Sequence, residues 1–469
     1  MEENKKIKNG DCHPKVLIKT FGCQMNKYDS EILMGLLRER GFVPTDDLES
    51  ADIALFNTCS VREHAEARVW GQVGMLKKIS SPLDFVQKTH KIKAGRTPRP
   101  TKKIVGLVGC MAQAHKEKIF DKLPHVDLVC GPQNIYNIPD YLEDIAKNNK
   151  RILAVDEKER PVDRENFSFR DKTKNPTAYV TIMEGCNNFC SYCIVPYVRG
   201  REKSRPPEFI IKEIEELLKK GIKEITLLGQ NVNSYGKDFK NGYTFINLLE
   251  DTDKINELRR LRFITCHPGD AEVKMFKAMS KLPTVCENLH LPIQSGSNRI
   301  LKAMNRKYTR EDYLRKVDVL KKLVPDCSLN TDIIVGFPDE TDEDFKQTVD
   351  ILKQVKFDTA YIFKYSPRPY TQAAKFEDNI PQKIKEERNQ ELLRLQKEIA
   401  FSNNQKLVNK RVGVLAEKVS KKDEDYLIGR TRTDKMIIFK GPLDLIGKIV
   451  EVEIKNVSIS GLGGEWIGL

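Results

Sequence analysis

The sequence predicts an α/β protein with three parts: an N-terminal domain built on a parallel sheet, a central partial barrel of six β/α units, and a small C-terminal β-barrel. Three observations support this prediction. Short apolar runs alternate with amphipathic stretches over most of the chain, which is typical of parallel sheets. From about residue 405 the pattern changes to short strands separated by glycines. The length of 469 residues suffices for about three domains.

The composition limits the class of protein. Hydrophobic residues make up 39% of the chain and charged residues 31%, which excludes a fibre and a wholly disordered chain. The 80 Lys and Arg residues exceed the 67 Asp and Glu residues, and the net charge of +13 favours a polyanionic partner such as nucleic acid. A basic surface that binds no ligand is the alternative.

The chain ends and the apolar runs indicate a compartment. The N-terminus lacks the apolar core of a signal peptide, and no apolar run approaches the ~20 residues that span a bilayer. We therefore expect a cytoplasmic protein that contacts no membrane. In that reducing compartment the 11 cysteines are not expected to form disulfides, and their spacing indicates metal or redox chemistry.

In the N-terminal domain, three segments repeat one order: an apolar run, a cysteine and a helix-like stretch. The runs are residues 16–18, 53–56 and 104–108, and the cysteines that follow are Cys23, Cys59 and Cys110. Because the carboxyl ends of parallel strands lie along one edge of a sheet, these cysteines can converge there. Taken singly, each is also explained as a small core residue. Asp29 or Ser30 is expected to cap the first helix, and Gly41 to end it.

Two further features of this domain leave alternatives open. Cys130 follows another apolar run, residues 126–129, and is either a fourth ligand or a core residue. Between Phe85 and Lys103 the chain has seven Lys and Arg residues and no acid. This composition predicts an exposed insertion, which contacts phosphate or is only solvated.

The strongest local signal is a loop that carries Cys186, Cys190 and Cys193. Three thiolates at this spacing can each bind one iron of a [4Fe-4S] cluster and leave the fourth iron without a protein ligand. Structural zinc, the alternative, needs four ligands, and no further Cys or His lies nearby. Phe189 and Tyr192 lie within the loop and are expected to shield a cluster from water.

The central part alternates between strands and helices. The predicted strands are residues 179–183, 225–228, 261–265, 289–291, 329–335 and 360–364, and the helices include 208–220 and 311–323. Six β/α units are fewer than the eight of a closed barrel, which predicts a partial barrel. Polar and glycine residues follow several strands, where barrel enzymes build their sites: Gly229-Gln230-Asn231, His267, Gln294-Ser295-Gly296 and Gly336-Phe337-Pro338.

Two basic clusters are candidates for contacts with a polyanion such as nucleic acid. The first follows the cysteine loop and comprises Arg199, Arg201, Lys203 and Arg205. We expect it to hold phosphates, with solvated surface as the alternative. The second lies in the C-terminal part, where alternating runs predict a β-barrel of OB-like size. It comprises Arg430, Arg432 and Lys435 on one predicted ribbon, and a plain structural cap is the alternative role of this barrel.

The cysteine loop resembles the signature of the radical S-adenosylmethionine (SAM) family. Over residues 14–469 the chain resembles the methylthiotransferase family, and within it the branch that acts on isopentenyl-adenosine in tRNA; its C-terminal part resembles the TRAM module. Besides the cysteine loop with the following Tyr197-Val198-Arg199-Gly200-Arg201, the matching stretches are Thr20-Phe21-Gly22-Cys23-Gln24-Met25-Asn26, Asn57-Thr58-Cys59-Ser60-Val61-Arg62-Glu63, Gly109-Cys110 and Gly229-Gln230-Asn231-Val232-Asn233. The chain departs from the pattern at Tyr370 and Gln372, where relatives usually have Gly and Pro, and in the insertion at 85–103.

The resemblance implies domains, cofactors and ligands. An N-terminal methylthiotransferase domain is expected at residues 14–147, a radical SAM core at 172–403 and a TRAM domain at 406–469. The implied cofactors are SAM and two [4Fe-4S] clusters. The implied ligands of the auxiliary cluster are Cys23, Cys59 and Cys110, with Cys130 in the core. Those of the radical SAM cluster are Cys186, Cys190 and Cys193. Residues implied to hold SAM are Gly229, Gln230, Gln294 and Ser295.

The resemblance also implies a reaction, the methylthiolation of carbon 2 of N6-isopentenyladenosine next to the tRNA anticodon. An aromatic C–H bond is not acidic, so a radical rather than a base must break it, and one SAM is implied as radical source and another as methyl donor. The implied partners are the tRNA anticodon stem-loop and a reducing electron-transfer protein of flavodoxin or ferredoxin type, with the chain a monomer. Alternatives are the same chemistry on threonylcarbamoyl-adenosine or a ribosomal-protein aspartate, and an RNA-binding iron–sulfur sensor without turnover.

Overall fold

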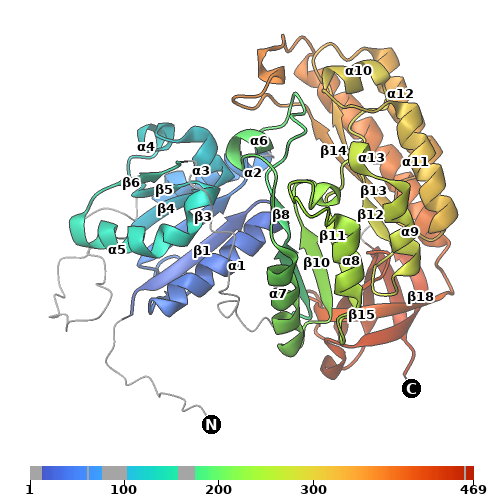
Figure 1. Ribbon diagram of the computed structural model, residues 1–469, viewed down its shortest axis with the longest axis horizontal. Coiled ribbons are helices and arrows are strands. Elements are labelled where there is room, and N and C mark those ends of the chain that lie inside the picture. The colour runs from blue at the N-terminus through green and yellow to red at the C-terminus, as the bar shows by residue number, and fades with distance from the viewer. Residues whose placement is uncertain (1–12, 61–62, 77–102, 157–174, 459–460, 469) are drawn as a thin grey trace. The chain divides into compact units, whose positions relative to one another are not determined.

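A computed structural model describes residues 13–60, 63–76, 103–156, 175–458 and 461–468 (Figure 1). The chain forms two compact units. The first comprises the residues up to 171 together with 197–200, and the second comprises the remainder. Of the predicted basic insertion, all but Lys103 lies outside the described residues. Among the described helices, none is long and apolar enough to cross a membrane.

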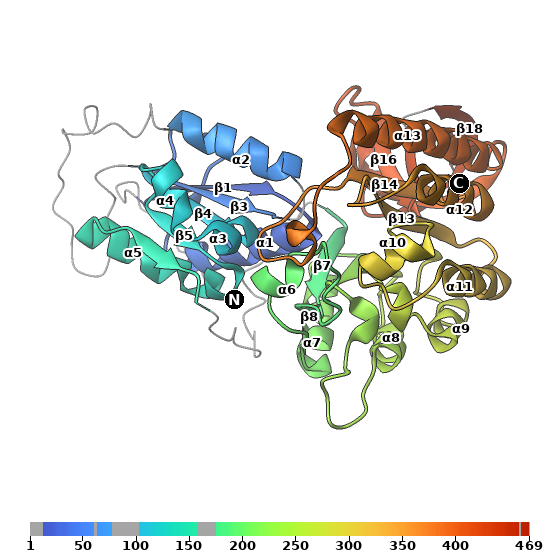
Figure 2. The same cartoon turned by 90° about the horizontal axis from the view of Figure 1, so that it is seen from above.

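The first unit is built on a six-stranded parallel sheet with the order β2-β1-β3-β4-β5-β6. The strands are β1 (Lys15–Phe21), β2 (Val43–Pro44), β3 (Ile53–Thr58), β4 (Ile104–Gly109), β5 (Leu128–Cys130) and β6 (Ile152–Ala154). The helices are α1 (Gln24–Glu39), α2 (Glu63–Met75), α3 (Cys110–His115), α4 (Lys118–Lys122), the 3-10 helix η3 (Pro132–Asn137) and α5 (Ile138–Asn148). Helices cover both faces of the sheet (Figure 2). The predicted parallel α/β domain is confirmed.

Strand β3 shows why its sequence is continuously apolar. Ile53 and Leu55 belong to a core cluster shared with α1 and α5, whereas Ala54 and Phe56 belong to a second cluster shared with α2, α3 and α4. A strand covered on both faces has no solvent side, so a polar residue would be buried at any position.

Helix α1 begins earlier than predicted. Cys23 is its N-cap residue, and the Asn26 side-chain oxygen accepts the Cys23 backbone N–H at 3.3 Å. Asp29 and Ser30 lie in the second turn, so the prediction that one of them caps the helix is wrong. Asn26 supplies the capping acceptor from inside the first turn, and the helix therefore starts directly after the cysteine. Gly41 follows the helix end with a positive φ of 82°, as predicted.

The second unit contains six parallel strands in two three-stranded groups, and the predicted partial barrel is confirmed. The groups are β7 (Thr177–Thr181), β10 (Glu224–Leu228) and β11 (Arg260–Ile264), and then β12 (Asn288–His290), β13 (Ser328–Val335) and β14 (Thr359–Lys364). Short strands β8 (Met183–Glu184) and β9 (Lys203–Ser204) pair beside them. A parallel bridge between Leu261 of β11 and Val285, three residues before β12, links the two groups.

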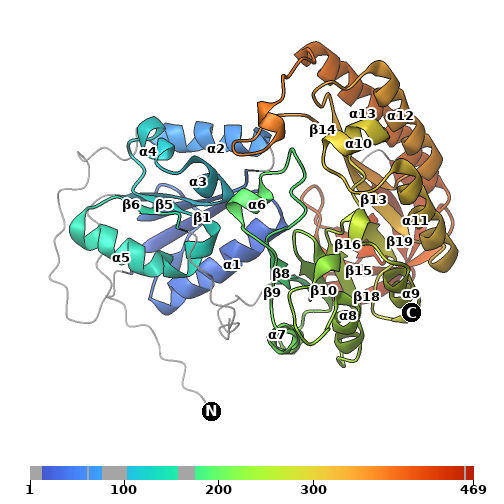
Figure 3. The same ribbon diagram turned by 45° about the horizontal axis from the view of Figure 1, so that its top comes forward.

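Helices cover the outer side of these strands (Figure 3). They are α7 (Pro207–Lys219), α8 (Phe245–Asp253), α9 (Val273–Lys281), α10 (Asn298–Ala303), α11 (Arg310–Leu323), α12 (Asp342–Val355) and α13 (Gln382–Gln405). The short α6 (Val195–Val198) follows the cysteine loop, and its last two residues are assigned to the first unit. Single 3-10 turns occur at η5 (Val232–Ser234), η6 (Pro268–Asp270), η7 (Ala373–Lys375) and η8 (Leu443–Leu445). One apolar cluster joins the strands to this layer.

The C-terminal segment folds into a closed barrel with the order β15-β16-β17-β19-β18, which confirms the predicted small β-barrel. Its strands are β15 (Arg411–Val419), β16 (Tyr426–Thr431), β17 (Met436–Lys440), β18 (Ile449–Ser458) and β19 (Gly461–Trp466). Apart from the parallel pair β17–β19, its strands are antiparallel.

Two buried arginines of β11 connect this barrel to the central strands. Arg260 donates to the backbone carbonyls of Gly413 and Arg430 at 3.0 and 2.6 Å. Arg262 donates to the next two carbonyls of the chain at 2.6 and 2.7 Å and pairs with Glu224 at 2.9 Å. Within the second unit, the C-terminal barrel is therefore docked on the central strands by charge-assisted hydrogen bonds.

Candidate functional site

The loop between β8 and α6 carries three thiols, which we call the loop triad: Cys186, Cys190 and Cys193. Hydrogen bonds anchor this loop on two sides. The Gly185 backbone N–H donates to the side-chain oxygen of Gln230 at 2.6 Å. The Ser191 backbone N–H donates to the carbonyl of Met304, after α10, at 3.0 Å. The thiols therefore lie on a loop that the surrounding fold holds in place.

Burial determines the protonation of the loop-triad thiols. It raises the pKa of Cys186 and raises that of Cys193 to about 12, so these thiols stay protonated near neutral pH unless a metal ion binds them. Iron binding would displace these protons, because the thiolate is the ligand. One cation already contacts the triad: the buried Arg306 donates from Nη1 to the Cys190 sulfur at 3.3 Å. Three thiols in this setting fit an iron–sulfur cluster.

The two aromatic residues of the loop lie where they can limit water. Tyr192 packs against an apolar cluster that contains Phe337 and Tyr365. Phe189 lies under the guanidinium of Arg201, whose central carbon is 4.3 Å from the ring centroid. Both rings are partly buried.

A second set of thiols, the edge triad, follows three neighbouring strands of the first unit: Cys23, Cys59 and Cys110. Strand register pairs Phe21 of β1 with Thr58 of β3, and Thr58 with Gly109 of β4. Cys59 and Cys110 come directly after the aligned Thr58 and Gly109. Cys23 comes two residues after the aligned Phe21. The register therefore brings the three cysteines to the same edge of the sheet, as expected, and their role as cluster ligands stays a prediction.

Residues of the two cysteine motifs shape this edge. A Cβ atom at Gly22 would stand 2.7 Å from the Cβ atom of Cys59, so a larger residue cannot occupy this position. The buried side chains of Asn26 and Asn57 are hydrogen-bonded at 2.9 Å, and Asn57 also donates to the Asn26 carbonyl at 2.9 Å. These contacts tie the start of α1 to the end of β3.

Arg199 brings positive charge to the edge triad. It belongs to the first unit, although it follows the cysteine loop in the sequence. Its Nε donates to the Cys110 sulfur at 3.3 Å, and its Nη2 pairs with Asp29 at 2.9 Å. The hydrogen bond with Cys59 and, less strongly, the charge of Arg199 lower the pKa of Cys23 to about 6, whereas burial raises that of Cys110.

Cys130 lies in the core, as the family pattern implied. It is fully buried and belongs to the apolar cluster formed with α1 and α5. Cys130 ends β5, the neighbour of β4 in the sheet. It is paired in register with Val108, which lies two residues before Cys110.

The basic run after the cysteine loop is only partly available for RNA. Arg199 and Arg205 are buried, and Arg205 pairs with the buried Glu213 at 2.8 Å. The prediction that these two arginines hold phosphates is wrong, because both neutralise buried carboxylates within their own unit. Arg201 is exposed and Lys203 is partly buried.

No group of three or more His, Cys, Asp or Glu side chains in the described part of the chain is close enough to hold a single metal ion. A [4Fe-4S] cluster does not require that closeness, because each thiolate binds a different iron.

Three segments match known families. Residues 180–352 match the Radical SAM superfamily, residues 15–131 the Uncharacterized protein family UPF0004, and residues 405–464 the TRAM domain. A relative from Clostridium botulinum (strain Loch Maree / Type A3), named tRNA-2-methylthio-N(6)-dimethylallyladenosine synthase, is 47% identical over 96% of both chains. One from Thermoanaerobacter sp. (strain X514) with the same name is 46% identical over 96% of this chain and 92% of its own. The chain belongs to the tRNA-2-methylthio-N(6)-dimethylallyladenosine synthase family.

A solved structure agrees at the level of the fold. The radical S-adenosylmethionine methyltransferase TsrM from Kitasatospora setae matches with a TM-score of 0.53 and 13% identity, over 77% of this chain and 74% of that one. The radical SAM match supports SAM and an iron–sulfur cluster as cofactors of this chain.

The residues expected to hold SAM differ in their structural environments. Gln230 anchors the cysteine loop through Gly185. The Ser295 hydroxyl is fully buried and within hydrogen-bond distance, 3.4 Å, of the hydroxyl of Thr348. Gln294 has a positive φ of 75° and lies at the end of the second strand group. Their role as SAM contacts stays a prediction.

Sequence reasoning missed a polar cluster around His290, on strands of the partial barrel and the loop after one of them. His290 Nδ1 is 3.2 Å from the Thr265 hydroxyl, and its Nε2 is 3.3 Å from an Asp332 oxygen. Tyr361 contacts His290 edge-on, with ring centroids 6.0 Å apart. The neighbours of Tyr361 in β14 pack into the apolar core, so alternation along that strand is the signal that could have placed Tyr361 on the opposite side.

The predicted basic ribbon of the C-terminal barrel is used largely within the chain. Arg432 pairs with Glu287 at 2.7 Å, and Lys435 pairs with Asp358 at 2.6 Å. Arg430 pairs with Asp434 at 2.7 Å but stays partly exposed. Arg432 and Lys435 thus help to dock the barrel on the central strands, and a role of the ribbon in RNA binding stays a prediction.

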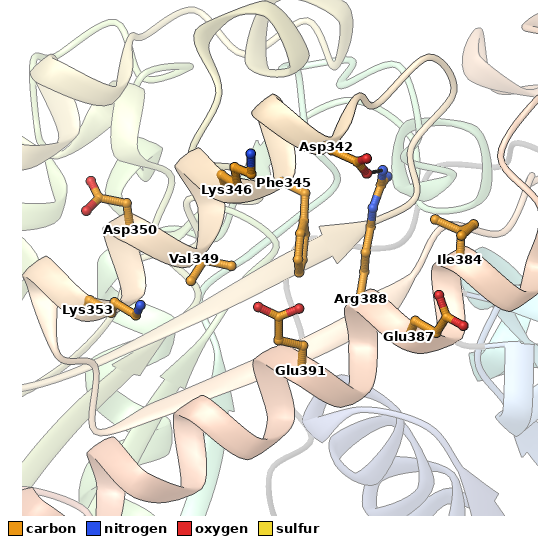
Figure 4. A pocket seen from close by; sticks show the side chains of 10 residues that line it. All are labelled: Asp342, Phe345, Lys346, Val349, Asp350, Lys353, Ile384, Glu387, Arg388 and Glu391. Carbon is orange, nitrogen blue, oxygen red and sulfur yellow. Dashed lines mark hydrogen bonds and ion pairs between the residues drawn. The ribbon is translucent and has the colours of Figure 1, made fainter.

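Two pockets among the described residues differ in chemistry. A groove of about 670 Å³ between α12 and α13 is lined by an apolar floor and by charges of both signs (Figure 4). It has no cysteine or histidine in its lining. A smaller pocket of about 270 Å³ adjoins the cysteine loop and is lined by Asn187, Asn188, Glu202, Lys237, Asp238 and Asp270. The smaller pocket therefore lies beside the loop that carries the loop triad.

Proposed function

We propose that this chain converts N6-isopentenyladenosine, next to the anticodon of tRNA, to its 2-methylthio derivative with SAM and two [4Fe-4S] clusters. The observation that supports this most is the pair of cysteine triads in a chain 47% identical to a synthase of that name. The loop triad is proposed to hold the radical SAM cluster, and the edge triad the auxiliary cluster. The proposed domains stay at residues 14–147, 172–403 and 406–469.

Two clusters would supply different chemistry: radical formation from SAM at one, and sulfur delivery at the other. The chain's part is to bind and orient. Each triad offers three thiols, which leaves one iron of each cluster without a cysteine. The anchored loop holds one triad, and the paired asparagines hold the other. The partly buried rings of Phe189 and Tyr192 would limit water near a reactive radical.

The tRNA is proposed to bind as a folded anticodon stem-loop with the target base turned out of its stack, because a stacked base is shielded. The TRAM match and the net charge of +13 support an RNA partner. A reducing protein of flavodoxin or ferredoxin type as electron donor, a monomeric state and a cytoplasmic location complete the proposal.

The test uses purified, anaerobically reconstituted protein with SAM, a reductant and tRNA that carries isopentenyl-adenosine. We expect release of 5′-deoxyadenosine together with methylthiolated tRNA. A variant with all three cysteines of the loop triad replaced by alanine should release none. An RNA-binding sensor would bind the tRNA and release no 5′-deoxyadenosine in either form, which would contradict the proposal.

A further inference from the structure

Each cysteine triad is contacted by one buried arginine. Arg306 donates to the Cys190 sulfur, and Arg199 donates to the Cys110 sulfur, both at 3.3 Å. Arg306 is 8% exposed and Arg199 is 4% exposed. The two arginines come from different elements of different units, so one repeated motif does not explain the similarity.

Burying a guanidinium is costly unless a negative group compensates it. A neutral thiol is only a weak acceptor and gives little compensation. A [4Fe-4S] cluster held by three thiolates carries net negative charge, and the charge becomes more negative when the cluster takes up an electron. A fixed cation at a ligand sulfur therefore stabilises the reduced cluster more than the oxidised one.

The two arginines differ in their other partners. Arg199 also pairs with the carboxylate of Asp29 at 2.9 Å, which offsets part of its charge. The other contacts of Arg306 are neutral: its Nη2 donates to the Pro292 carbonyl at 2.8 Å, and its Nε lies 2.7 Å from the Tyr308 hydroxyl. The positive charge at the loop triad is thus less compensated than that at the edge triad.

We propose that Arg306 and Arg199 are positioning residues that each raise the reduction potential of one cluster, Arg306 at the loop triad and Arg199 at the edge triad. The inference rests on the proposed function only for the presence of clusters at both triads. The less compensated Arg306 then serves the cluster that must accept an electron to cleave SAM.

The experiment is a redox titration of full-length, anaerobically reconstituted protein, followed by electron paramagnetic resonance. Each cluster is observed alone in a background with the other triad changed to alanine. Arg306→Met is expected to shift the midpoint potential of the loop-triad cluster to a more negative value and to leave the edge-triad cluster unchanged. Arg199→Met is expected to do the reverse.

Charge can be separated from structural damage. Asp29→Asn keeps Arg199 and removes its counter-charge, so it should shift the edge-triad potential to a more positive value. Arg306→Lys keeps the positive charge. The midpoint potential of its loop-triad cluster should therefore lie closer to that of the unmodified protein than to that of Arg306→Met. The matched control is Arg388→Met, a buried arginine that pairs with Glu340 at 2.7 Å and contacts no cysteine. It should move neither potential.

Potentials that stay unchanged in both methionine variants, or that move together in both clusters, would overturn the inference. If a methionine variant loses its iron, the sign of the Asp29→Asn shift and the Arg306→Lys value decide the matter. Iron content and methylthiolation by the unmodified protein are measured on the same preparation. If the unmodified protein holds both clusters but does not methylthiolate the tRNA, the proposed function is contradicted. The redox test of the two arginines remains valid in that case.

Discussion

Gly22, Asn26 and Asn57 show how single residues determine the edge triad. Their types are visible in the sequence as neighbours of the cysteines, and the resemblance implied both triads. Their contacts were not predictable, because Asn26 and Asn57 are 31 residues apart in the chain. The same holds for Arg199 and Arg306, whose cysteine partners lie 89 and 116 residues away. The hydrophobic pattern of a sequence predicts which face of a helix or strand a residue occupies. It does not predict a hydrogen-bond partner that lies tens of residues away in the chain.

Cys130 gives a residue-scale prediction. Because it lies in an apolar cluster, Cys130→Ala should keep both clusters and lower the free energy of unfolding by about 1 kcal/mol. Iron analysis and denaturant unfolding measure the two effects, with Cys110→Ala as the control that should lose the auxiliary cluster. If Cys130→Ala alone removes that cluster, the edge triad is assigned wrongly.

His267 gives a second residue-scale prediction. Burial, with the charge of Arg306, lowers its pKa to about 3, so the folded protein keeps it neutral. The unfolded chain binds this proton below about pH 6.5, and stability is therefore lost as the pH falls from 6.5 toward 3. Between pH 7.5 and 5.5 the loss at this site should be about 1 kcal/mol. His267→Asn keeps an acceptor for the Gly269 N–H and should reduce this pH dependence in denaturant unfolding; an unchanged pH dependence would contradict it.

At the scale of elements, strongly periodic segments were predictable and short ones were not. The strand predicted at residues 329–335 is β13, and the helix predicted at 311–323 is α11, each within one residue at its ends. Strand β6, with three residues, was not predicted, because its pairing with β5 rather than its own pattern stabilises it. The start of α1 was misplaced because its capping acceptor, Asn26, lies within the helix.

The docking of the C-terminal barrel gives an element-scale prediction. Arg260→Leu should leave the carbonyls of Gly413 and Arg430 without their donor and lower the free energy of unfolding by about 2–3 kcal/mol. Thermal and denaturant unfolding measure this effect. The neighbouring Arg259 is exposed, so Arg259→Leu is the matched control and should cost under about 0.5 kcal/mol. Equal losses in the two variants would contradict a specific docking role.

At the scale of the whole molecule, two separate cysteine triads predict the iron content. After anaerobic reconstitution we expect about eight irons per chain, and about four when Cys186, Cys190 and Cys193 are all replaced by alanine. Iron and acid-labile sulfide analysis give these numbers. Near-complete loss of iron in the triple variant, or zinc in the native protein, would contradict a two-cluster enzyme.

The substrate distinguishes this family from enzymes with the same chemistry on other targets. An isopentenyl group is apolar and calls for an apolar pocket, whereas the carboxylate of threonylcarbamoyl-adenosine calls for a positive charge. Family membership at 47% identity favours the isopentenyl substrate.

The most direct measurement offers one enzyme preparation three substrates in parallel, with SAM and a reductant: tRNA carrying isopentenyl-adenosine, tRNA carrying threonylcarbamoyl-adenosine, and a small-subunit ribosomal protein. Mass spectrometry of the nucleosides and of the protein detects the added methylthio group. We predict methylthiolation of the isopentenyl-adenosine tRNA alone. Methylthiolation of either other substrate, with the isopentenyl-adenosine left unmodified, would contradict the assigned function.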